Sequence, residues 1–273
     1  MIRVATAPMN WNNDDLPGLR PAVPVEQVLA EMVEAGYEGT EFGTGFPSEP
    51  GRLRQLLARH GLVLASNFCW VALQDGARQA AEIAKALAVA RTLSALQVPE
   101  LILGIRGDGR RLALAGRVPA DGGAGLSAEG WSRLAEGVHA LAEACRPLGV
   151  RLAVHPHAGS YIETREELAR LLALTDPAAL GLCVDTGHLA YGGADPVEVV
   201  GAYGARVRYV HLKDVDPRVL ARARQDGLGF LDALRGYVFC GLGRGAVALD
   251  PFVAALRAAG FRGWLVIEED TSP

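Results

Sequence analysis

"LGLCVDTGHLAYGG", residues 180–193, is the stretch that decides the fold. A short apolar run meets a carboxylate at Asp185, and His188 follows before the chain becomes glycine-rich. An aspartate in this place can begin a turn or cap the next helix. It can also be a metal ligand or catalytic group at the carboxyl end of a buried parallel strand. The other strand ends must distinguish the two interpretations.

Short apolar segments alternate with longer amphipathic segments along the whole chain, which is typical of successive βα units and a parallel sheet. We expect eight strands and seven intervening helices in a single domain, residues 1–273. This pattern predicts an α/β fold, a (β/α)8 TIM barrel whose eighth helix is incomplete or missing. The expected strands are Ile2–Ala5, Gly39–Phe42, Val63–Ser66, Glu100–Leu103, Arg151–His155, Gly181–Asp185, Val207–His211 and Trp264–Glu268. The expected helices lie within residues 24–36, 49–61, 77–97, 127–149, 164–175, 195–204 and 249–260.

Two connections are much longer than the usual links between elements of a barrel. They span residues 104–126 and 213–249, and the second contains an expected helix near Pro217–Leu234. Because both follow strands, both should lie on the catalytic face of the barrel. The sequence leaves open whether they close over a substrate.

Metal-capable side chains stand at the ends of the last four expected barrel strands. They are His155, Asp185, His211 and Glu268. In a barrel, neighbouring strand ends converge on one axis, so residues distant in sequence come within coordination distance. Two imidazoles and two carboxylates favour Mn²⁺, Co²⁺, Fe²⁺ or Zn²⁺ over Mg²⁺ and Ca²⁺, which prefer oxygen ligands. The sequence therefore predicts a divalent metal site with these four ligands.

Other polar residues near these strand ends are candidates for catalysis and substrate binding. His157 has the inward parity of His155 but lies beyond Pro156, so we expect it beside the substrate. His188 can hold a substrate oxygen or act as acid or base, and Lys213 can reach an anion or an enolate. For the proton steps we consider Glu268, His188 and His157, without separating base from acid.

The first expected strand runs into a polar loop that contains Trp11 and Asn12. This loop offers a ring wall and several hydrogen-bonding groups, which suit a polyhydroxylated ligand. Glu41 ends the second expected strand, and a buried glutamate without a partner is costly, so we expect it to face the site. Trp11, Asn12 and Glu41 are therefore expected to bind substrate, together with His157, His188 and Lys213.

The bulk composition excludes several classes of partner. A net charge of -4 and a pI near 5.9 provide no basic surface for nucleic acid or an anionic membrane. The four cysteines are far apart and form no C-x-x-C pair, which indicates free thiols in a reducing compartment. No apolar run approaches the length of about 18 residues that a membrane span needs. We expect a cytoplasmic protein with a small-molecule partner, and a homo-oligomer stays open.

Seven blocks of the chain have distinctive sequences: "APMNWNNDDLPGLR", "EAGYEGTEFGTGFP", "HPHAGSYIET", "TDPAALGLCVDTGHLAYGGADP", "VRYVHLKDV", "FCGLGRGAVALD" and "GWLVIEED". Together they resemble the inosose dehydratases, which act in myo-inositol catabolism and belong to the xylose-isomerase-like barrel superfamily of sugar isomerases and epimerases. The likeness spans residues 2–270, and "NWNNDDLP" and "HPHAGS" are its most specific parts.

The resemblance implies a hydro-lyase that converts 2-keto-myo-inositol (scyllo-inosose) to a trihydroxycyclohexane-dione with Mn²⁺ or Co²⁺, and it implies glutathione as a cofactor. The metal ligands of the superfamily carry over onto His155, Asp185, His211 and Glu268. The chain also departs from the family, with Gly45 where members usually have a lysine and with different residues near "ASNFCW". The isomerases and epimerases have a glutamate at the position of His155, which counts against simple epimerisation here.

Three alternatives remain at this point. The first is an isomerase or 3-epimerase that acts on a ketose sugar. The second is a metal-free binding barrel without catalysis. A nuclease built on the same barrel fits less well, because the charge balance does not suit a phosphate backbone.

Overall fold

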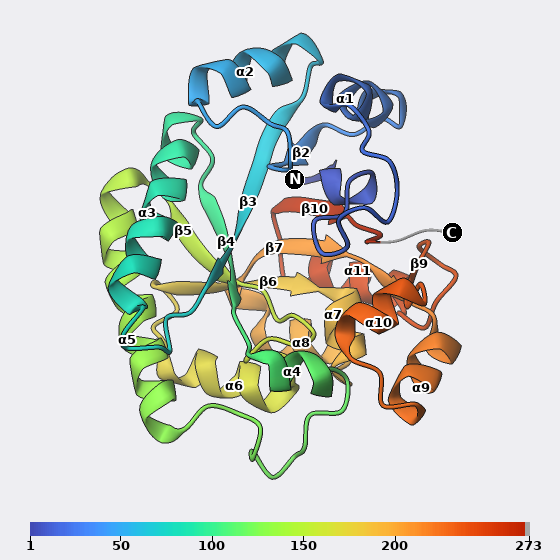
Figure 1. Ribbon diagram of the computed structural model, residues 1–273. Helices are drawn as coiled ribbons and strands as arrows, with labels where there is room; N and C mark the ends of the chain where they lie inside the picture. The colour runs from blue at the N-terminus through green and yellow to red at the C-terminus, as the bar shows by residue number, and fades with distance from the viewer. Residues whose placement is uncertain (271–273) are drawn as a thin grey trace.

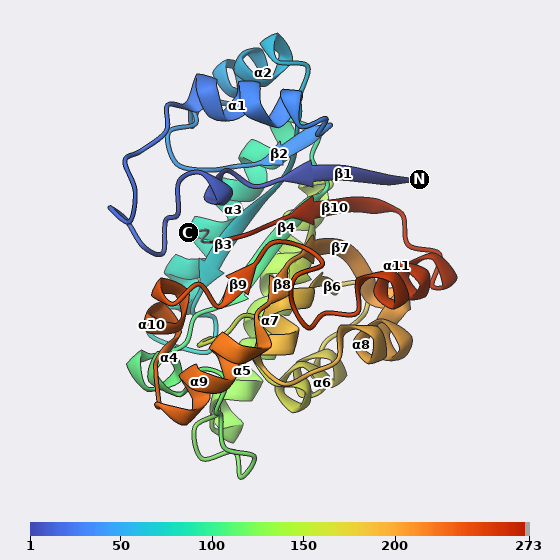
Figure 2. The ribbon, with the colours of Figure 1, turned by 90° about the vertical axis from the view of Figure 1, so that its right-hand side faces the viewer.

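Eight parallel strands close into a barrel in the computed structural model, which describes residues 1–270 (Figure 1). The strands follow the order β1-β10-β7-β6-β5-β4-β3-β2 around the barrel, so the first strand pairs with the last (Figure 2). All eight expected strands are present, and the (β/α)8 prediction is confirmed. Their bounds are β1 Ile2–Thr6, β2 Gly39–Glu41, β3 Val63–Val71, β4 Glu100–Ile105, β5 Arg151–Val154, β6 Leu180–Asp185, β7 Val207–Leu212 and β10 Gly263–Ile267.

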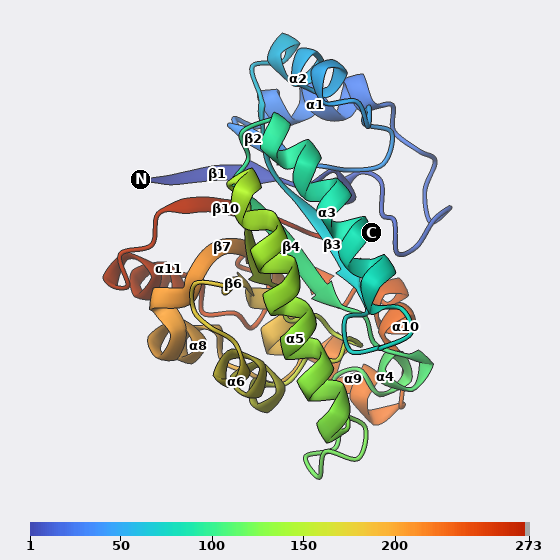
Figure 3. The ribbon, with the colours of Figure 1, turned by 90° about the vertical axis from the view of Figure 1, so that its left-hand side faces the viewer.

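The seven expected helices surround the barrel, as the side view in Figure 3 shows for α3 and α5. Local caps explain where several begin: Ser127 caps α5, and Thr164 forms a capping box with Glu167 at the start of α6. No helix follows β10 up to residue 270, as expected for the eighth helix. The helix bounds are α1 Val25–Glu34, α2 Pro50–Arg59, α3 Gln79–Ala95, α5 Ala128–Cys145, α6 Arg165–Leu174, α8 Pro196–Tyr203 and α11 Leu249–Ala258.

Alternation along the strands builds the interior of the barrel in layers. The middle layer is apolar and buried, and the next layer toward the carboxyl ends of the strands is polar. The indole ring of Trp264 lies at the end of the barrel where the strands begin, and the guanidinium of Arg3 lies 3.9 Å from the ring centroid. A side chain at Gly39 would meet this ring, since a Cβ there would lie 2.9 Å from its edge. The apolar layer consists of Ala5, Ala65, Ile102, Ala153, Cys183, Tyr209 and Val266.

The two long connections contain elements of their own and pack against each other. The first contains α4 (Gly109–Leu114), and the second contains β8 (Asp214–Val215), α9 (Pro217–Gln225), α10 (Phe230–Arg235) and β9 (Phe239–Cys240). The single helix expected near Pro217–Leu234 is thus two helices, because Gly227 adopts a positive φ of 69° between them. The guanidinium of Arg117 donates hydrogen bonds to the carbonyls of Gly227 and Leu228, at 2.9 and 3.3 Å.

One buried carboxylate fixes the base of the second connection. Asp214 accepts four backbone N–H groups, those of Val215 at 2.9 Å, Gly243 at 3.0 Å, Gly245 at 2.9 Å and Val247 at 3.0 Å. Its side chain is fully buried. These backbone donors compensate the loss of water around the buried charge. Because they come from both ends of the second connection, the two ends are held together at Asp214.

Two further expectations concern the chain as a whole. All four cysteines are free thiols, and only Cys240 is partly accessible. Within residues 1–270, no helix combines the length and the apolar character that a membrane span requires.

Candidate metal centre and substrate cavity

A cavity of about 490 Å³ opens at the carboxyl ends of the barrel strands. His155, His211 and Glu268 line it, and Asp185 lies fully buried directly beside them. The register of the sheet explains this convergence, since Asp185 on β6 is paired with His211 on β7. All four side chains expected as metal ligands therefore come together at one place.

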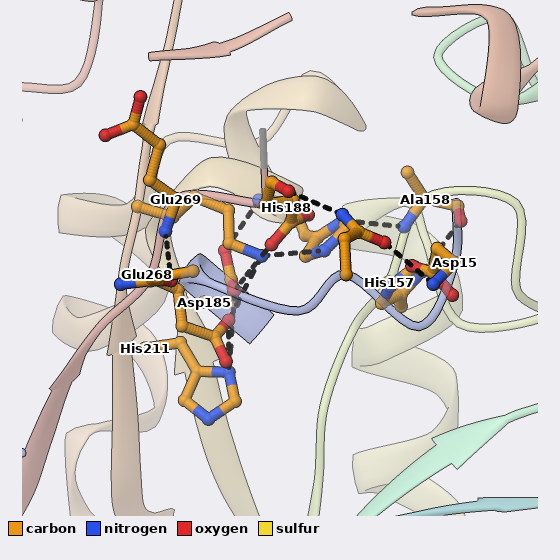
Figure 4. A network of polar contacts seen from close by, with 12 residues as sticks. Asp15, His157, Ala158, Asp185, His188, His211, Glu268 and Glu269 are labelled. Atoms are coloured by element: carbon orange, nitrogen blue, oxygen red, sulfur yellow. Dashed lines mark hydrogen bonds and ion pairs between the residues drawn. The ribbon is translucent and has the colours of Figure 1, made fainter. Parts of the chain in front are cut away.

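Four of the distances between these side chains match the edges of a coordination polyhedron. Figure 4 shows Asp185, His211 and Glu268 close together. The Nε2 atom of His155 lies 3.3 Å from Asp185 Oδ2 and 3.1 Å from His211 Nδ1. His211 Nδ1 lies 3.6 Å from Asp185 Oδ2 and 3.2 Å from Glu268 Oε2. Ligand atoms about 2.0–2.2 Å from one cation, at tetrahedral or octahedral angles, are separated by about 2.8–3.6 Å. The donor set and its spacing fit a divalent cation.

Three more donors lie within reach of this cluster. Cys183 groups with His155 and His211, His188 with His155 and Asp185, and Glu41 with His211 and Glu268. Cys183 belongs to the apolar layer of the barrel interior, below the four side chains, and Glu41 faces the Nε2 atom of His211. His188 already accepts a backbone hydrogen bond at Nδ1. The set His155, Asp185, His211 and Glu268 is therefore the better candidate.

The two carboxylate oxygens of Asp185 have different contacts, so both interpretations of this residue from the sequence apply. Oδ1 accepts the backbone N–H of His188 at 2.7 Å and caps α7 (Thr186–Tyr191). Oδ2 faces His155 and His211. Burial alone raises the pKa of Asp185, but the ammonium of Lys213 and the neighbouring imidazoles hold it well below its usual range. The carboxyl is thus a helix cap and an ionised ligand at once.

Glu41 supports the cluster from behind. Its Oε1 atom lies 3.1 Å from His211 Nε2, the ring nitrogen that points away from the other ligands. A carboxylate in this position fixes the orientation of a metal-binding imidazole and increases its basicity. The sequence predicted that Glu41 faces the site, and the structure places it in the cavity lining.

Lys213 is a buried ammonium in contact with three carboxylates. Its Nζ lies 2.7 Å from Asp270 Oδ1, 3.1 Å from Glu268 Oε2 and 3.6 Å from Asp185 Oδ2. Burial alone lowers the pKa of Lys213, but Asp270, Glu268 and Asp185 raise it well above its ordinary value. Lys213 is therefore a charged donor toward the cavity rather than a free amine that could attack a carbonyl.

His157 and His188 are stacked, with ring centroids 3.7 Å apart, and their hydrogen bonds fix opposite tautomers. His157 Nδ1 lies 2.8 Å from the carbonyl oxygen of Ala158, which can only accept, so this nitrogen carries the proton. The N–H of Ala158 donates to His188 Nδ1 at 3.1 Å. His188 Nε2 lies 3.4 Å from the Lys213 ammonium, which is a longer contact, and that ammonium has carboxylate oxygens at 2.7 and 3.1 Å. The fixed backbone donor therefore decides the tautomer, and the neutral ring of His188 carries its proton on Nε2. Burial lowers the pKa of His157 to about 3 and also lowers that of His188, which keeps both rings neutral. One ring thus offers a lone pair at Nε2 and the other an N–H.

Aromatic side chains flank the histidine pair from two sides. Phe68 and Trp70, from β3, line the cavity and lie over Gly104, where a Cβ would lie 2.6 Å from both rings. Phe230 and Phe239, from the second long connection, pack against His188 at centroid distances of 5.7 and 5.0 Å.

The structure places Trp11 and Asn12 beside a different cavity. The indole N–H of Trp11 donates to Glu31 on α1, and the side chain of Asn12 exchanges two hydrogen bonds with the backbone of Val23. Both residues line a second cavity of about 330 Å³, not the first. Their role in substrate binding stays a prediction.

Three carboxylates that line the first cavity, Asp14, Asp15 and Asp270, had no individual role in the sequence analysis, which considered Asp14 and Asp15 only as part of the polar loop suited to a polyhydroxylated ligand. A signal existed for Asp270, because it has the same parity as Glu268, two residues before it on an inward-facing course. Asp14 and Asp15 belong to the polar loop after β1, where no periodicity indicates direction. Asn13 anchors this loop, since its side-chain amide donates to the carbonyl of Asp270.

Comparison with known proteins identifies the family. Residues 29–273 match the family described as xylose isomerase-like TIM barrel. The chain belongs to this family. It is 37% identical over 277 residues to an inosose dehydratase of Geobacillus kaustophilus, covering 100% of this chain and 88% of that protein. It is also 37% identical over 276 residues to the rhizopine catabolism protein MocC of Rhizobium meliloti, covering 100% of this chain and 82% of that protein.

Solved structures of the family share the fold at low sequence identity. The IOLI protein with a bound zinc atom superposes with a TM-score of 0.71 at 16% identity, covering 98% of this chain and 89% of that chain. At this identity the likeness supports the architecture alone. The family model and the full-length relatives thus place the chain in the xylose isomerase-like superfamily, among relatives that include proteins named inosose dehydratase.

Proposed function

We propose that the protein is a divalent-metal-dependent dehydratase of a cyclic polyol ketone, which converts 2-keto-myo-inositol to a trihydroxycyclohexane-dione. The carrying observation is the cavity in which four candidate metal ligands, a buried ammonium and two histidines of opposite tautomer converge. The full-length relatives named inosose dehydratase support a cyclitol ketone as the substrate.

His155, Asp185, His211 and Glu268 would hold the cation, for which Mn²⁺ and Co²⁺ are the first choices and Zn²⁺ and Fe²⁺ are compatible with the same donors. When bound, it supplies Lewis acidity toward the substrate carbonyl. Glu41 would orient His211 for this task.

We assign the proton steps that the sequence left open with the help of the tautomers. Loss of water next to a ketone requires removal of a proton from the carbon beside the carbonyl and protonation of the departing hydroxyl. The free lone pair of His157 Nε2 suits the first step, and the N–H of His188 suits the second. The C–H electrons form the new double bond, the C–O bond breaks, and the hydroxyl leaves as water. The enol that results tautomerises to the dione. Lys213 would stabilise the negative charge that develops on the carbonyl oxygen.

Glutathione does not fit the residues that adjoin the site. The second cavity is the space next to the substrate cavity, and its charged side chains are Asp14, Asp270 and Arg20. Glutathione carries two carboxylates and one ammonium, so one guanidinium beside two carboxylates leaves one carboxylate of glutathione without a cationic partner. We therefore derive no step through glutathione.

The test is to incubate Mn²⁺-loaded protein with 2-keto-myo-inositol and to record the ultraviolet absorbance of the dione. We expect the wild type to form the dione, and His157→Gln and His188→Gln each to lower the rate by about 10²- to 10⁴-fold without loss of metal. His139→Gln, on the outside of the barrel, is the matched control. Isomerisation or epimerisation without dione would instead indicate the sugar-isomerase alternative, and a metal-free, inactive protein purified without chelator would indicate a binding barrel.

A further inference from the structure

The backbone of Ala158 lies against both of the stacked histidines (Figure 4). Its carbonyl accepts a hydrogen bond from His157 Nδ1 at 2.8 Å, and its N–H donates to His188 Nδ1 at 3.1 Å. Because these two bonds fix the tautomers of the two rings, the group that holds this backbone in place also controls which ring nitrogen keeps a free lone pair.

Glu163 holds the peptide unit that contains the Ala158 carbonyl. The N–H of Gly159 donates to Glu163 Oε2 at 2.6 Å. A trans peptide unit is planar, and its C=O and N–H point in opposite directions. The carbonyl of Ala158 and the N–H of Gly159 are therefore opposite edges of one rigid unit. The carboxylate on one edge fixes the direction in which the other edge faces His157.

The conformation of Gly159 explains why the peptide unit needs such an anchor. Gly159 has a positive φ of 77°, and glycine adopts positive and negative φ about equally well. Without the bond to Glu163, rotation about the flanking backbone bonds could turn the Ala158 carbonyl away from His157. Another residue could not supply the rigidity, because a Cβ at Gly159 would lie 2.9 Å from Cδ2 of Leu112 on α4.

The carboxylate of Glu163 is itself held in place by the first long connection. The residue is 1% exposed, and its Oε1 atom accepts the N–H of Gly116 at 2.6 Å. The guanidinium of Arg111 lies 3.9 Å from Oε2, while it binds Glu167 at 2.6 and 2.9 Å. Glu163 lies outside the lining of the substrate cavity, so it can affect a substrate only through the peptide unit.

The charge of Glu163 also strengthens the bond on the far edge of the peptide unit. A hydrogen bond from an N–H to a carboxylate is charge-assisted, and hydrogen bonds in a chain polarise one another. The Ala158 carbonyl thereby becomes a better acceptor for the proton on His157 Nδ1. This favours the tautomer with a lone pair at Nε2 and increases the basicity of that lone pair.

We propose that Glu163 is a positioning residue that sets the tautomer of His157 through the peptide unit between Ala158 and Gly159. The effect on the tautomer stands on these hydrogen bonds alone. Its consequence for catalysis rests on the proposed function, in which the lone pair of His157 Nε2 removes the substrate proton.

The experiment observes the protons on the ring nitrogens directly. Correlation spectra of ¹⁵N and ¹H in the histidine rings distinguish a nitrogen that carries a proton from one with a lone pair. They are recorded after addition of Zn²⁺, which is diamagnetic, and at pH 8, because burial raises the pKa of Glu163 to about 7. His157→Gln identifies the His157 signals among those of the six histidines. In the wild type we expect the proton of His157 on Nδ1.

Two variants of Glu163 test its role. Glu163→Ala removes both oxygens, and we expect the tautomer ratio of His157 to shift about 10-fold toward Nε2–H, the worth of one hydrogen bond. Glu163→Gln keeps one oxygen without the charge, so its shift should be smaller. Circular dichroism verifies the fold of each variant, and the milder glutamine variant keeps the test valid if alanine does not fold.

Glu167→Gln is the matched control for general loosening of this region. Glu167 is also a buried carboxylate of the same network, but it bonds to Arg111 and to the N–H groups of Glu163 and Thr164, not to Gly159. We expect this variant to lose stability and to keep the His157 signals of the wild type.

Kinetics measure the consequence for the proposed reaction. In Glu163→Ala the kcat for dione formation should fall by about 10-fold, in proportion to the lost tautomer, while KM stays within about 2-fold of the wild type. A change in KM alone would contradict the positioning role, because Glu163 does not line the cavity.

The outcomes separate this inference from the proposed function. A shifted His157 tautomer in a folded Glu163 variant, absent from Glu167→Gln, supports the positioning role even if no dione forms. Three results overturn it even if the ketone is dehydrated: a wild-type His157 protonated on Nε2, unchanged His157 signals in every folded Glu163 variant, or an equal shift in Glu167→Gln.

Discussion

Replacing Glu41 tests whether the carboxylate behind His211 contributes to metal affinity. Glu41 is 4% exposed and lies 3.1 Å from His211 Nε2, while Nδ1 of the same ring faces the other ligands. Glu41→Gln keeps an oxygen that accepts the N–H but removes the charge, and Glu41→Ala removes both. Loss of such a supporting partner typically costs about 10- to 100-fold in metal affinity. This corresponds to about 1.4–2.7 kcal/mol. We expect glutamine near the lower limit and alanine near the upper limit.

The measurement is a competition titration of the apoprotein with Mn²⁺ against a fluorescent chelator. Glu82→Gln is the matched control, because Glu82 is also a buried glutamate, at 6% exposure, but lies on α3 and pairs with Arg78 and Lys85. The control should leave Mn²⁺ affinity unchanged. An alanine variant that binds Mn²⁺ as tightly as the wild type would refute the supporting role of Glu41. If the glutamine variant bound Mn²⁺ more weakly than the alanine variant, the assumed contributions of the charge and of the hydrogen bond to metal affinity would be wrong.

The remaining predictions concern the metal centre and stability. His211→Ala should abolish Mn²⁺ binding, measured by metal analysis, while circular dichroism stays native, because the apolar layer lies below this residue. Arg111→Met should lower the free energy of unfolding in urea by about 3–5 kcal/mol, since it leaves Glu167 buried without the guanidinium that binds it at 2.6 and 2.9 Å. Arg165→Met, which removes the exposed ion pair with Glu198, should lower the free energy of unfolding by less than about 1 kcal/mol. Burial raises the pKa of Glu100 to about 7, so the folded state binds a proton that the unfolded state releases near pH 4.5, and stability falls as pH rises through this window. Glu100→Gln should remove that fall and be more stable than wild type at pH 8 by up to about 3 kcal/mol, whereas an unchanged pH profile would contradict the assignment.

Periodicity made most of the barrel predictable from the sequence. Buried strands and amphipathic helices repeat distinct patterns, and each strand end in the last half of the barrel exposes a polar residue of fixed parity. The shortest elements could not be predicted, because β8 and β9 have two residues each, too few to show an alternation of apolar and polar residues. The break between α9 and α10 depends on the backbone of Gly227, which the apolar spacing on either side does not reveal.

The candidate site was predictable to the same depth, down to the identity of the converging side chains. Parity brought His155, Asp185 and His211 to one axis, since alternation along strands is a geometric rule. It could not give the tautomers of His157 and His188, because these depend on one backbone unit, that of Ala158. The sequence also did not reveal which way the side chains of the polar loop after β1 point. In the structure its aspartates line the first cavity, whereas Trp11 contacts Glu31 outside that cavity.

The four hydrogen bonds that converge on Asp214 make the second long connection exchangeable. Asp214 and the β8–β9 pair hold both ends of residues 216–242 in place. The structure of the barrel therefore depends little on the length of the chain between these ends. Doubling the length of such a tethered loop costs only about 0.6 kcal/mol in closure entropy. Because Phe230 and Phe239 reach His188 from this segment, evolution or protein engineering can change the packing around His188 by exchanging the segment, while the carboxyl ends of the barrel strands stay intact.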